Sequence, residues 1–211
     1  LLLEEIAELN VPITRSEVSS GTPANDLHDR RDLKVRELAG LMDIHTSSDD
    51  KGSLSITLSN GVALVEGERA RTFFTAPDPT NPFGASVTRV QLRDLSNVVD
   101  VTNDIAGGEI GGRLRARDTI LPGAIRSLDT IAYNLAVGVN TVHQAGRGLN
   151  NAVGDFFTAP VQLEDSARDL SVDSAILANP DAIAAGLTDG PSDNRNALAL
   201  AALRDSKSPL F

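Results

Sequence analysis

The chain contains no cysteine and no tryptophan, a single tyrosine, and only 3% aromatic residues. Without cysteine it forms no disulfide and offers no thiolate to a metal or a substrate. With so few aromatic rings, it is poorly equipped for stacking on nucleic-acid bases or sugars, and for aromatic anchors in an interface. The lack of cysteine suits a chain that stays unfolded and uncrosslinked until it is outside the cell.

Basic residues are also scarce, with 19 Lys and Arg against 29 Asp and Glu and a net charge of -10. A nucleic-acid surface needs a basic face, so we expect no nucleic acid among the partners. No stretch approaches the ~18 uninterrupted apolar residues of a membrane span, and we expect no membrane partner either. The 211 residues suffice for one good-sized domain or two small ones. Because the chain starts at Leu1 without methionine, we expect a piece of a longer protein.

The strongest pattern that is present is a seven-residue repeat of leucine and valine. Its positions are Leu114, Leu121, Leu128, Leu135 and Val142, with Ile125, Ala132 and Val139 four residues after the three middle leucines. Two apolar positions in each heptad are typical of a helix packed lengthwise against other helices. The helix is expected to start near Glu109 or Asp118 and to end near Gly146, with Pro122 in its first turn or at a kink. This seam favours a rod, a bundle or a subunit over an enzyme with a pocket.

Two helices joined by a short loop are expected before residue 43. Pro12 should kink or end the first helix, and Asn25 or Asp26 can cap the second. A polar cluster at the start of the second helix is expected to brace that end by pairing at i, i+4, as between Asp26 and Arg30. The bracing residues are Asn25, Asp26, Arg30, Arg31 and Asp32.

From about residue 44 to residue 104 the apolar residues alternate, as in strands with one buried face. Leu54, Ile56 and Leu58 point one way, and Asn60-Gly61 then separates them from a second apolar run. Asn-Gly between apolar runs is a strong hairpin signal, and a two-residue turn needs positive φ at both residues. Further strands are expected at 71–75, 86–91 and 97–101. The pattern predicts a small antiparallel meander of about five strands.

The predicted fold is therefore α+β and mainly α. It is an elongated bundle of long helices built from residues 1–43 and 105–211, with the antiparallel β module of residues 44–104 inserted between the second and third long helices. The C-terminal part should hold a short strand at 170–172, a short helix at 181–185, and a last helix from Asp193, capped by Ser192 or Asp193, to about Arg204.

Three groups of residues resemble known reactive motifs, but each lacks a part that the motif requires. Residues 107–112 are glycine-rich, but they contain no G-x-G-x-x-G spacing and no Gly-Lys-Ser/Thr follows them. The glycines therefore favour a flexible joint between sheet and helix. Residues 48–51 match S-x-x-K and residues 192–194 match S-D-N, but K-T-G is missing and Ser48 lies in an acidic hydrophilic turn. His28, His45 and His143 lack metal-ligand spacing. We assign no catalytic, cofactor-binding or metal residue, and expect neither a cofactor nor enzyme activity.

Several blocks, in this order, resemble the FlgK family of bacterial flagellar hook-associated proteins. They are residues 25–32, 52–56, 59–65, 108–114, 117–122, 128–132, 140–146, 156–157, 179–185 and 193–197. Each block alone is weak evidence for the resemblance, but the order and spacing of the blocks are specific to the family. The resemblance extends from about residue 9 to residue 204.

The resemblance implies a non-catalytic axial subunit that joins the hook to the filament as a ring of copies. It implies an extracellular place in the flagellum, reached unfolded through the flagellar type III export pathway. The implied partners are further copies of the protein, the hook protein, the second junction protein, and an export chaperone that binds an absent terminal segment. It also implies a central fragment without the terminal segments that form a coiled-coil inner tube. An outer part is expected to be reduced, because residues 157–170 form a short stretch.

Two other classes stay open. One is another axial protein, such as the second junction protein or a flagellin, although the hairpin block and the tail after Asp181 favour the first junction protein. The other is a secreted adhesin or binding module, which would need a ligand surface that the low aromatic content does not favour.

Overall fold

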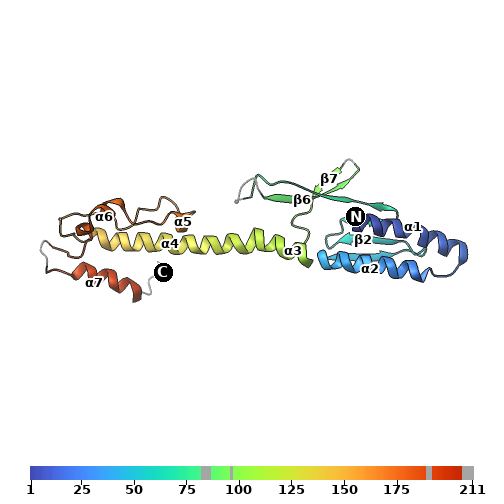
Figure 1. Cartoon of the computed structure of the whole chain (residues 1–211), viewed down its shortest axis with the longest axis horizontal. Helices are drawn as coiled ribbons and strands as arrows, with labels where there is room; N and C mark the ends of the chain where they lie inside the picture. Colours follow the sequence, from blue (N-terminus) through green and yellow to red (C-terminus); the bar gives the residue numbers. More distant parts are fainter. Residues whose placement is uncertain (82–86, 96, 189–191, 206–211) are drawn as a thin grey trace. The chain divides into compact units, whose positions relative to one another are not determined.

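The computed structural model describes residues 1–81, 87–95, 97–188 and 192–205. The chain divides into two compact units, Leu1–Asp118 and Thr119–Phe211, and Figure 1 shows the elements in chain order. This division differs from the boundaries expected near residues 43 and 105. The reason is that the strands share one hydrophobic core with the first two helices.

Helices α1 (Leu2–Ser20) and α2 (Asn25–Leu41) begin the first unit and pack side by side (Figure 1). The buried residues of α1 recur at spacings of three and four, as one helical face requires. They are Leu3, Ile6, Ala7, Asn10 and Ile13. The helix does not end at Pro12 but continues to Gly21, whose φ of 67° closes it in the left-handed conformation. Neither Asn25 nor Asp26 caps α2, because the N-cap is Ala24 without a side-chain cap.

A four-stranded antiparallel sheet follows, in the order β1-β2-β3-β4. Its strands are β1 (Ile44–Ser48), β2 (Leu54–Leu58), β3 (Ala63–Glu66) and β4 (Arg69–Ala70). The alternation expected at Leu54, Ile56 and Leu58 is confirmed, since all three are buried.

The turn between β2 and β3 is a hairpin at Asn60 and Gly61, as expected, but of another type. Leu58 N–H donates to Val62 O at 2.8 Å, so the loop has three residues, and only Gly61 has positive φ, at 87°. The expectation of positive φ at Asn60 is wrong because a three-residue loop needs the left-handed conformation only at its last residue.

A second, three-stranded antiparallel sheet has the order β5-β6-β7. Its strands are β5 (Thr72–Pro77), β6 (Thr88–Asp94) and β7 (Asn97–Asp100). The β region is thus two sheets instead of one meander, and the start of the strand expected at 86–91 lies outside the described residues. Leu95, at the turn after β6, has a φ of 51°. A leucine in the left-handed region costs about 1–2 kcal/mol.

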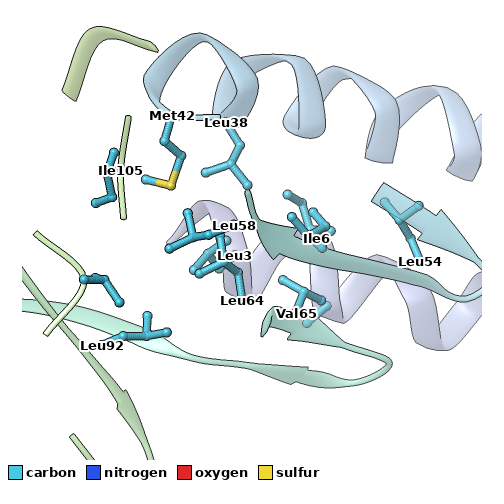
Figure 2. Close-up of a cluster of buried hydrophobic side chains, with 13 residues drawn as sticks. Leu3, Ile6, Leu38, Met42, Leu54, Leu58, Leu64, Val65, Leu92 and Ile105 are labelled. Atoms are coloured by element: carbon cyan, nitrogen blue, oxygen red, sulfur yellow. The ribbon is translucent and has the colours of Figure 1, made fainter. Parts of the chain in front are cut away.

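One cluster of buried aliphatic side chains joins α1, α2 and both sheets (Figure 2). Its members are Leu3, Ile6, Ala7, Leu38, Met42, Leu54, Ile56, Leu58, Leu64, Val65, Leu92, Val101 and Ile105. A fully buried Leu, Ile, Val or Met side chain contributes about 1.5–3 kcal/mol. The cluster therefore joins the described helices and strands of the first unit into one hydrophobic core.

The glycine-rich stretch 107–112 is close-packed and is not the flexible joint that the sequence suggests. A Cβ on Gly107 would lie 2.1 Å from Asp43 Oδ1. Gly108 has a φ of 67°, and a Cβ there would lie 2.4 Å from the carbonyl carbon of Leu41. Glycine is needed here because the backbone passes directly over the end of α2.

The long helix is assembled from α3 (Gly108–Arg115), a π-helical turn (Ala116–Ile120) and α4 (Leu121–Gln144). The π turn lies directly before Pro122, which has no N–H to donate and whose ring clashes with the carbonyl four residues earlier in an α-helix. A wider turn at this place accommodates the proline without ending the helix.

The second unit continues after α4 with mostly irregular chain. It contains α5 (Ser166–Asp169), α6 (Ser174–Ala178), a 3-10 turn (Pro180–Ala182), α7 (Arg195–Ala202) and a final 3-10 turn (Leu203–Asp205). The strand expected at 170–172 is only a bridge between Phe157 and Val172, and the helix expected at 181–185 is the 3-10 turn. Within the described residues, no helix is both long enough and apolar enough to span a membrane.

Candidate functional site

The heptad residues do not form one continuously packed seam within this chain. Leu114 is half-buried against the core of the first unit. Leu121, Ile125 and Leu128 are 55%, 44% and 58% exposed. The remaining positions are buried or half-buried: Ala132, Leu135, Val139 and Val142. The interpretation that the chain's own helices cover the seam is therefore wrong for its first half, because the described residues place nothing over it.

The uncovered residues form what we call the aliphatic face of α4: Leu121, Ile125, Leu128 and Ile131. They recur at spacings of three and four, and so lie on one side of the helix. Ile131 is 62% exposed, like its neighbours on this face. Isolated exposed apolar residues are common in proteins, but a contiguous row of branched aliphatic side chains marks an interaction surface.

Three buried polar residues in the later part of α4 hold the rest of the second unit. Asp129 accepts a hydrogen bond from Ala167 N–H at 2.9 Å, at the start of α5. Asn140 accepts from the N–H groups of Phe156 and Phe157, at 3.0 and 2.9 Å, and donates to Phe157 O. Irregular chain must satisfy its backbone groups somewhere, and here α4 supplies the partners.

His143 is the third of these buried residues and has no exposed surface. Its Nδ1 lies 2.8 Å from Gly154 O, and its Nε2 lies 2.9 Å from Ala184 N. A carbonyl can only accept and an N–H can only donate, so the ring is neutral with its hydrogen on Nδ1. His143 therefore links two loops to α4.

The polar cluster at the start of α2 braces the unit through one arginine only. Asn25, Asp26, Arg30 and Asp32 are exposed, and the described residues contain no Asp26–Arg30 pair. Arg31 instead is 3% exposed. It is buried because it reaches inward, towards α1 and the turn after β1, instead of pairing along its own helix as the sequence pattern predicted.

Arg31 and Asn10 form the centre of a buried hydrogen-bond network. Arg31 Nη1 donates to Asn10 Oδ1 at 2.8 Å and to Gly52 O at 2.7 Å. Asn10 also accepts from Leu54 N–H at 3.0 Å and donates to Leu54 O and Gly67 O at 2.8 and 2.7 Å. One amide thus joins α1, α2 and the four-stranded sheet. No sequence pattern marks Asn10 as buried, apart from its place within an apolar stripe.

The network reaches the surface through His28 and Glu17. Arg31 Nη2 lies 3.0 Å from His28 Nδ1, and His28 Nε2 lies 2.6 Å from Glu17 Oε1. The His28 hydrogen bond and the Ala24 N–H lower the pKa of Glu17. Burial lowers the pKa of Arg31, which leaves it positively charged at neutral pH.

A second polar group of the first unit surrounds the π turn. Arg117 Nη1 donates to Thr88 O at 2.7 Å, and its guanidinium makes a bidentate pair with Asp118. Asn81 Nδ2 donates to Asp118 Oδ1 at 3.2 Å. The Arg117 hydrogen bond holds the pKa of Asp118 below its usual value. These bonds fix the π turn to the three-stranded sheet.

The residues of the S-x-x-K match lie at the surface. Ser48 ends the exposed strand β1, and Lys51 is an exposed turn residue whose N–H donates to Asp49 Oδ1 at 2.9 Å. In the part of the chain that the structure describes, no three or more His, Asp or Glu side chains are grouped so that they could hold a metal ion.

Asp193 holds the segment before α7 by hydrogen bonds, and we expect the stability of that segment to depend on pH. Its carboxylate accepts from the N–H groups of Leu187, Thr188 and Arg195 and from the Arg195 guanidinium. The Arg195 side chain is the first cause of a pKa far below the ordinary 3.8. Because the folded pKa is depressed, the stabilisation is complete above pH ~4 and is lost as the pH falls below it.

We therefore expect hydrogen-exchange protection factors at Leu187 and Thr188 to fall when the pH is lowered from 5 to 2. Asp193→Asn removes the titrating group, so its protection should be lower at pH 5 and should change little with pH. A wild-type chain whose protection at these amides is constant over that range contradicts this assignment.

Comparison with known proteins identifies the family. The family model described as "Flagellar hook-associated protein FlgK helical domain" matches residues 1–188. The chain belongs to the FlgK family. The resemblance of the chain to this family is thereby confirmed.

Relatives in the FlgK family support the same assignment. The chain is 32% identical over 157 residues to flagellar hook-associated protein 1 of Escherichia coli (strain K12), covering 74% of this chain and 28% of that protein. It is 30% identical over 168 residues to flagellar hook-associated protein 1 of Salmonella typhimurium (strain LT2), covering 77% and 30%.

A solved structure of the FlgK family has a similar fold. It is the flagellar hook junction protein FlgK from Burkholderia pseudomallei, matched with a TM-score of 0.58 and 25% identity over 74% of this chain and 28% of that one. The chain thus spans less than a third of the length of the FlgK proteins that it matches.

Proposed function

We propose that this chain is part of a structural, non-catalytic axial subunit that joins the hook to the filament of a bacterial flagellum. Its membership in the FlgK family supports this function. The aliphatic face of α4 supports it independently, because the described residues place this row of branched side chains in solvent. A subunit that packs lengthwise against other helices needs such a face.

The aliphatic face is the surface that we assign to assembly. The half-buried Leu135, Val139 and Val142 extend it towards the end of α4. Its partners are helices of neighbouring copies in a ring, or helices from the rest of the polypeptide. Leu114 and Ala132 are not available to such a partner, because the first contacts the core of its own unit and the second is buried.

The remaining partners follow from the position of such a subunit. The hook protein lies on one side of the ring and the second junction protein on the other, and an export chaperone binds a segment outside this chain. The protein is extracellular and reaches its place through the flagellar type III export apparatus. The absence of cysteine is compatible with export in an unfolded state, because no disulfide can form before the chain has folded.

Deletion of the gene that encodes the whole protein tests this function. We expect intact hooks without filaments, and filament protein released into the medium. Restoring the gene should restore attached filaments, and immunogold labelling should place the protein at the hook–filament junction. Cells that keep attached filaments after deletion contradict the proposal. If those cells instead lose surface attachment while swimming normally, an adhesin is the better assignment.

A further inference from the structure

Residues 119–128 form a stretch of the long helix whose side chains are almost all in solvent. Within this stretch only Pro122 is not exposed. Among the described residues, its side chains form a single hydrogen bond, and that bond lies within the helix, from Ser127 Oγ to Gly123 O at 3.0 Å. Most helices in proteins are stabilised by the packing of one face against other elements, and this stretch has no such support here.

The sequence of the stretch also has weak helix propensity. Pro122 donates no backbone hydrogen bond, and the π turn before it ends at Ile120. Gly123 lies in α4, and a Cβ built on it would meet no atom within 4 Å, so packing does not require glycine at this place. Glycine is the least favourable residue in a helix interior apart from proline. The bond from Ser127 to the backbone four residues earlier weakens the helix further.

The chain is anchored on both sides of this stretch. Before it, Arg117 donates to Thr88 O at 2.7 Å and pairs with Asp118, within the first unit. After it, Asp129 is buried and accepts the hydrogen bond of Ala167 N–H at 2.9 Å, within the second unit. The supported parts of the long helix therefore end at residue 118 and begin again at residue 129.

We propose that residues 119–128 unfold and refold locally while the anchored parts stay folded, and that assembly into a ring of copies holds them helical. Three residues of the aliphatic face, Leu121, Ile125 and Leu128, belong to this stretch. While the stretch is open these side chains form no row, so an isolated copy presents no complete packing surface. The step at assembly rests on the proposed function, whereas the local opening is a property of the chain alone. Part of the free energy of assembly is then spent on ordering the helix.

Hydrogen exchange of the isolated chain, followed by mass spectrometry, tests the local opening. The amides of residues 124–128 should exchange at least about tenfold faster than those of residues 136–143, which lie in the same helix and include the buried Asn140 and His143. Low concentrations of urea should hardly change the rates at 124–128, because a local opening exposes little new surface, and should speed exchange at 136–143. Equal protection of the two segments, or the same urea dependence in both, overturns the local opening.

Gly123→Ala separates helix propensity from packing, because the added methyl group has no atom within 4 Å. Exchange at residues 124–128 should slow about fivefold, which corresponds to the ~1 kcal/mol between glycine and alanine in a helix. Gly40→Ala is the matched control, since Gly40 lies in α2 and its Cβ would also meet nothing within 4 Å. The control should leave exchange at 124–128 unchanged. Unchanged rates in Gly123→Ala would mean that helix propensity does not govern this stretch, and the proposal would be wrong.

The same measurement on the whole protein tests the step at assembly. The amides of residues 124–128 should be at least about tenfold more protected in isolated flagella than in the whole protein before assembly. If the protein is present in the flagellum and the protection is equal in the two states, the step at assembly is wrong and the proposed function stands. If the protein is absent from the flagellum, the proposed function fails, and exchange of the isolated chain still decides the local opening.

Discussion

Asn10→Leu is expected to lower the free energy of unfolding of the first unit by about 3–5 kcal/mol. Asn10 is 1% exposed and its amide joins α1 to Leu54, Gly67 and Arg31. Leucine would leave the Leu54 N–H, two carbonyls and part of a buried guanidinium without their partner. Domains are stable by only about 5–15 kcal/mol, so the loss is a large fraction of the total.

Urea titrations followed by circular dichroism measure this loss. Asn10→Asp is an informative second variant, because it keeps acceptors for Arg31 and Leu54 N–H but replaces the two donated bonds with a carboxylate oxygen that faces two carbonyl oxygens. Asn103→Leu replaces an exposed asparagine of the same unit and should change the unfolding free energy by less than about 0.5 kcal/mol. A change below about 1 kcal/mol in Asn10→Leu would show that the network contributes little.

The second large effect is expected on assembly and not on folding. Ile125→Glu with Leu128→Glu places two charges on the aliphatic face of α4. Both residues are exposed in the chain by itself, so the urea midpoint should hardly change. In the assembled flagellum the same carboxylates would have to lose water without a partner, which costs several kcal/mol for each charge. Swimming should be abolished, with hooks formed and filaments missing.

Ser127→Glu with Thr130→Glu is the matched control for this variant. It adds the same two charges to the same helix at exposed positions that lie off the aliphatic face. Swimming halos and electron-microscope counts of filaments per cell should resemble those of the wild type. If the double variant on the aliphatic face also swims normally, α4 contributes no packing surface to the junction.

The long helix illustrates what could be read from the sequence and what could not. A seven-residue repeat of aliphatic residues predicts a helix and identifies its apolar side, and α4 is such a helix. The repeat does not say which molecule covers that side. Leu121 and Leu128 are exposed here because the chain's own loops attach mainly farther along α4, through Asp129, Asn140 and His143.

Buried polar residues were the least predictable part of the fold. Asn10, Arg31 and His143 belong to residue types that usually lie at the surface, and nothing in a single sequence marks them as buried. They are buried because distant backbone groups lack partners: residues 52, 54 and 67 in one unit, and residues 154 and 184 in the other. Which backbone groups lack a hydrogen-bond partner is decided only when the chain has folded. The strand at Leu54–Leu58 was predictable because its alternation is local.

The way in which irregular chain is attached to α4 has a mechanical consequence. When the C-terminal side of the second unit is pulled, its hydrogen bonds are loaded one after another. The first is the bond from Asn196 to Ala184 O, and the next is the bond from Ala184 N–H to His143. The bonds of Ala167 to Asp129 and of Phe156 and Phe157 to Asn140 are loaded afterwards. Attachments that break one at a time peel away at a much lower force than attachments sheared together. We therefore expect the second unit to detach from its supporting helix stepwise under a steady pull.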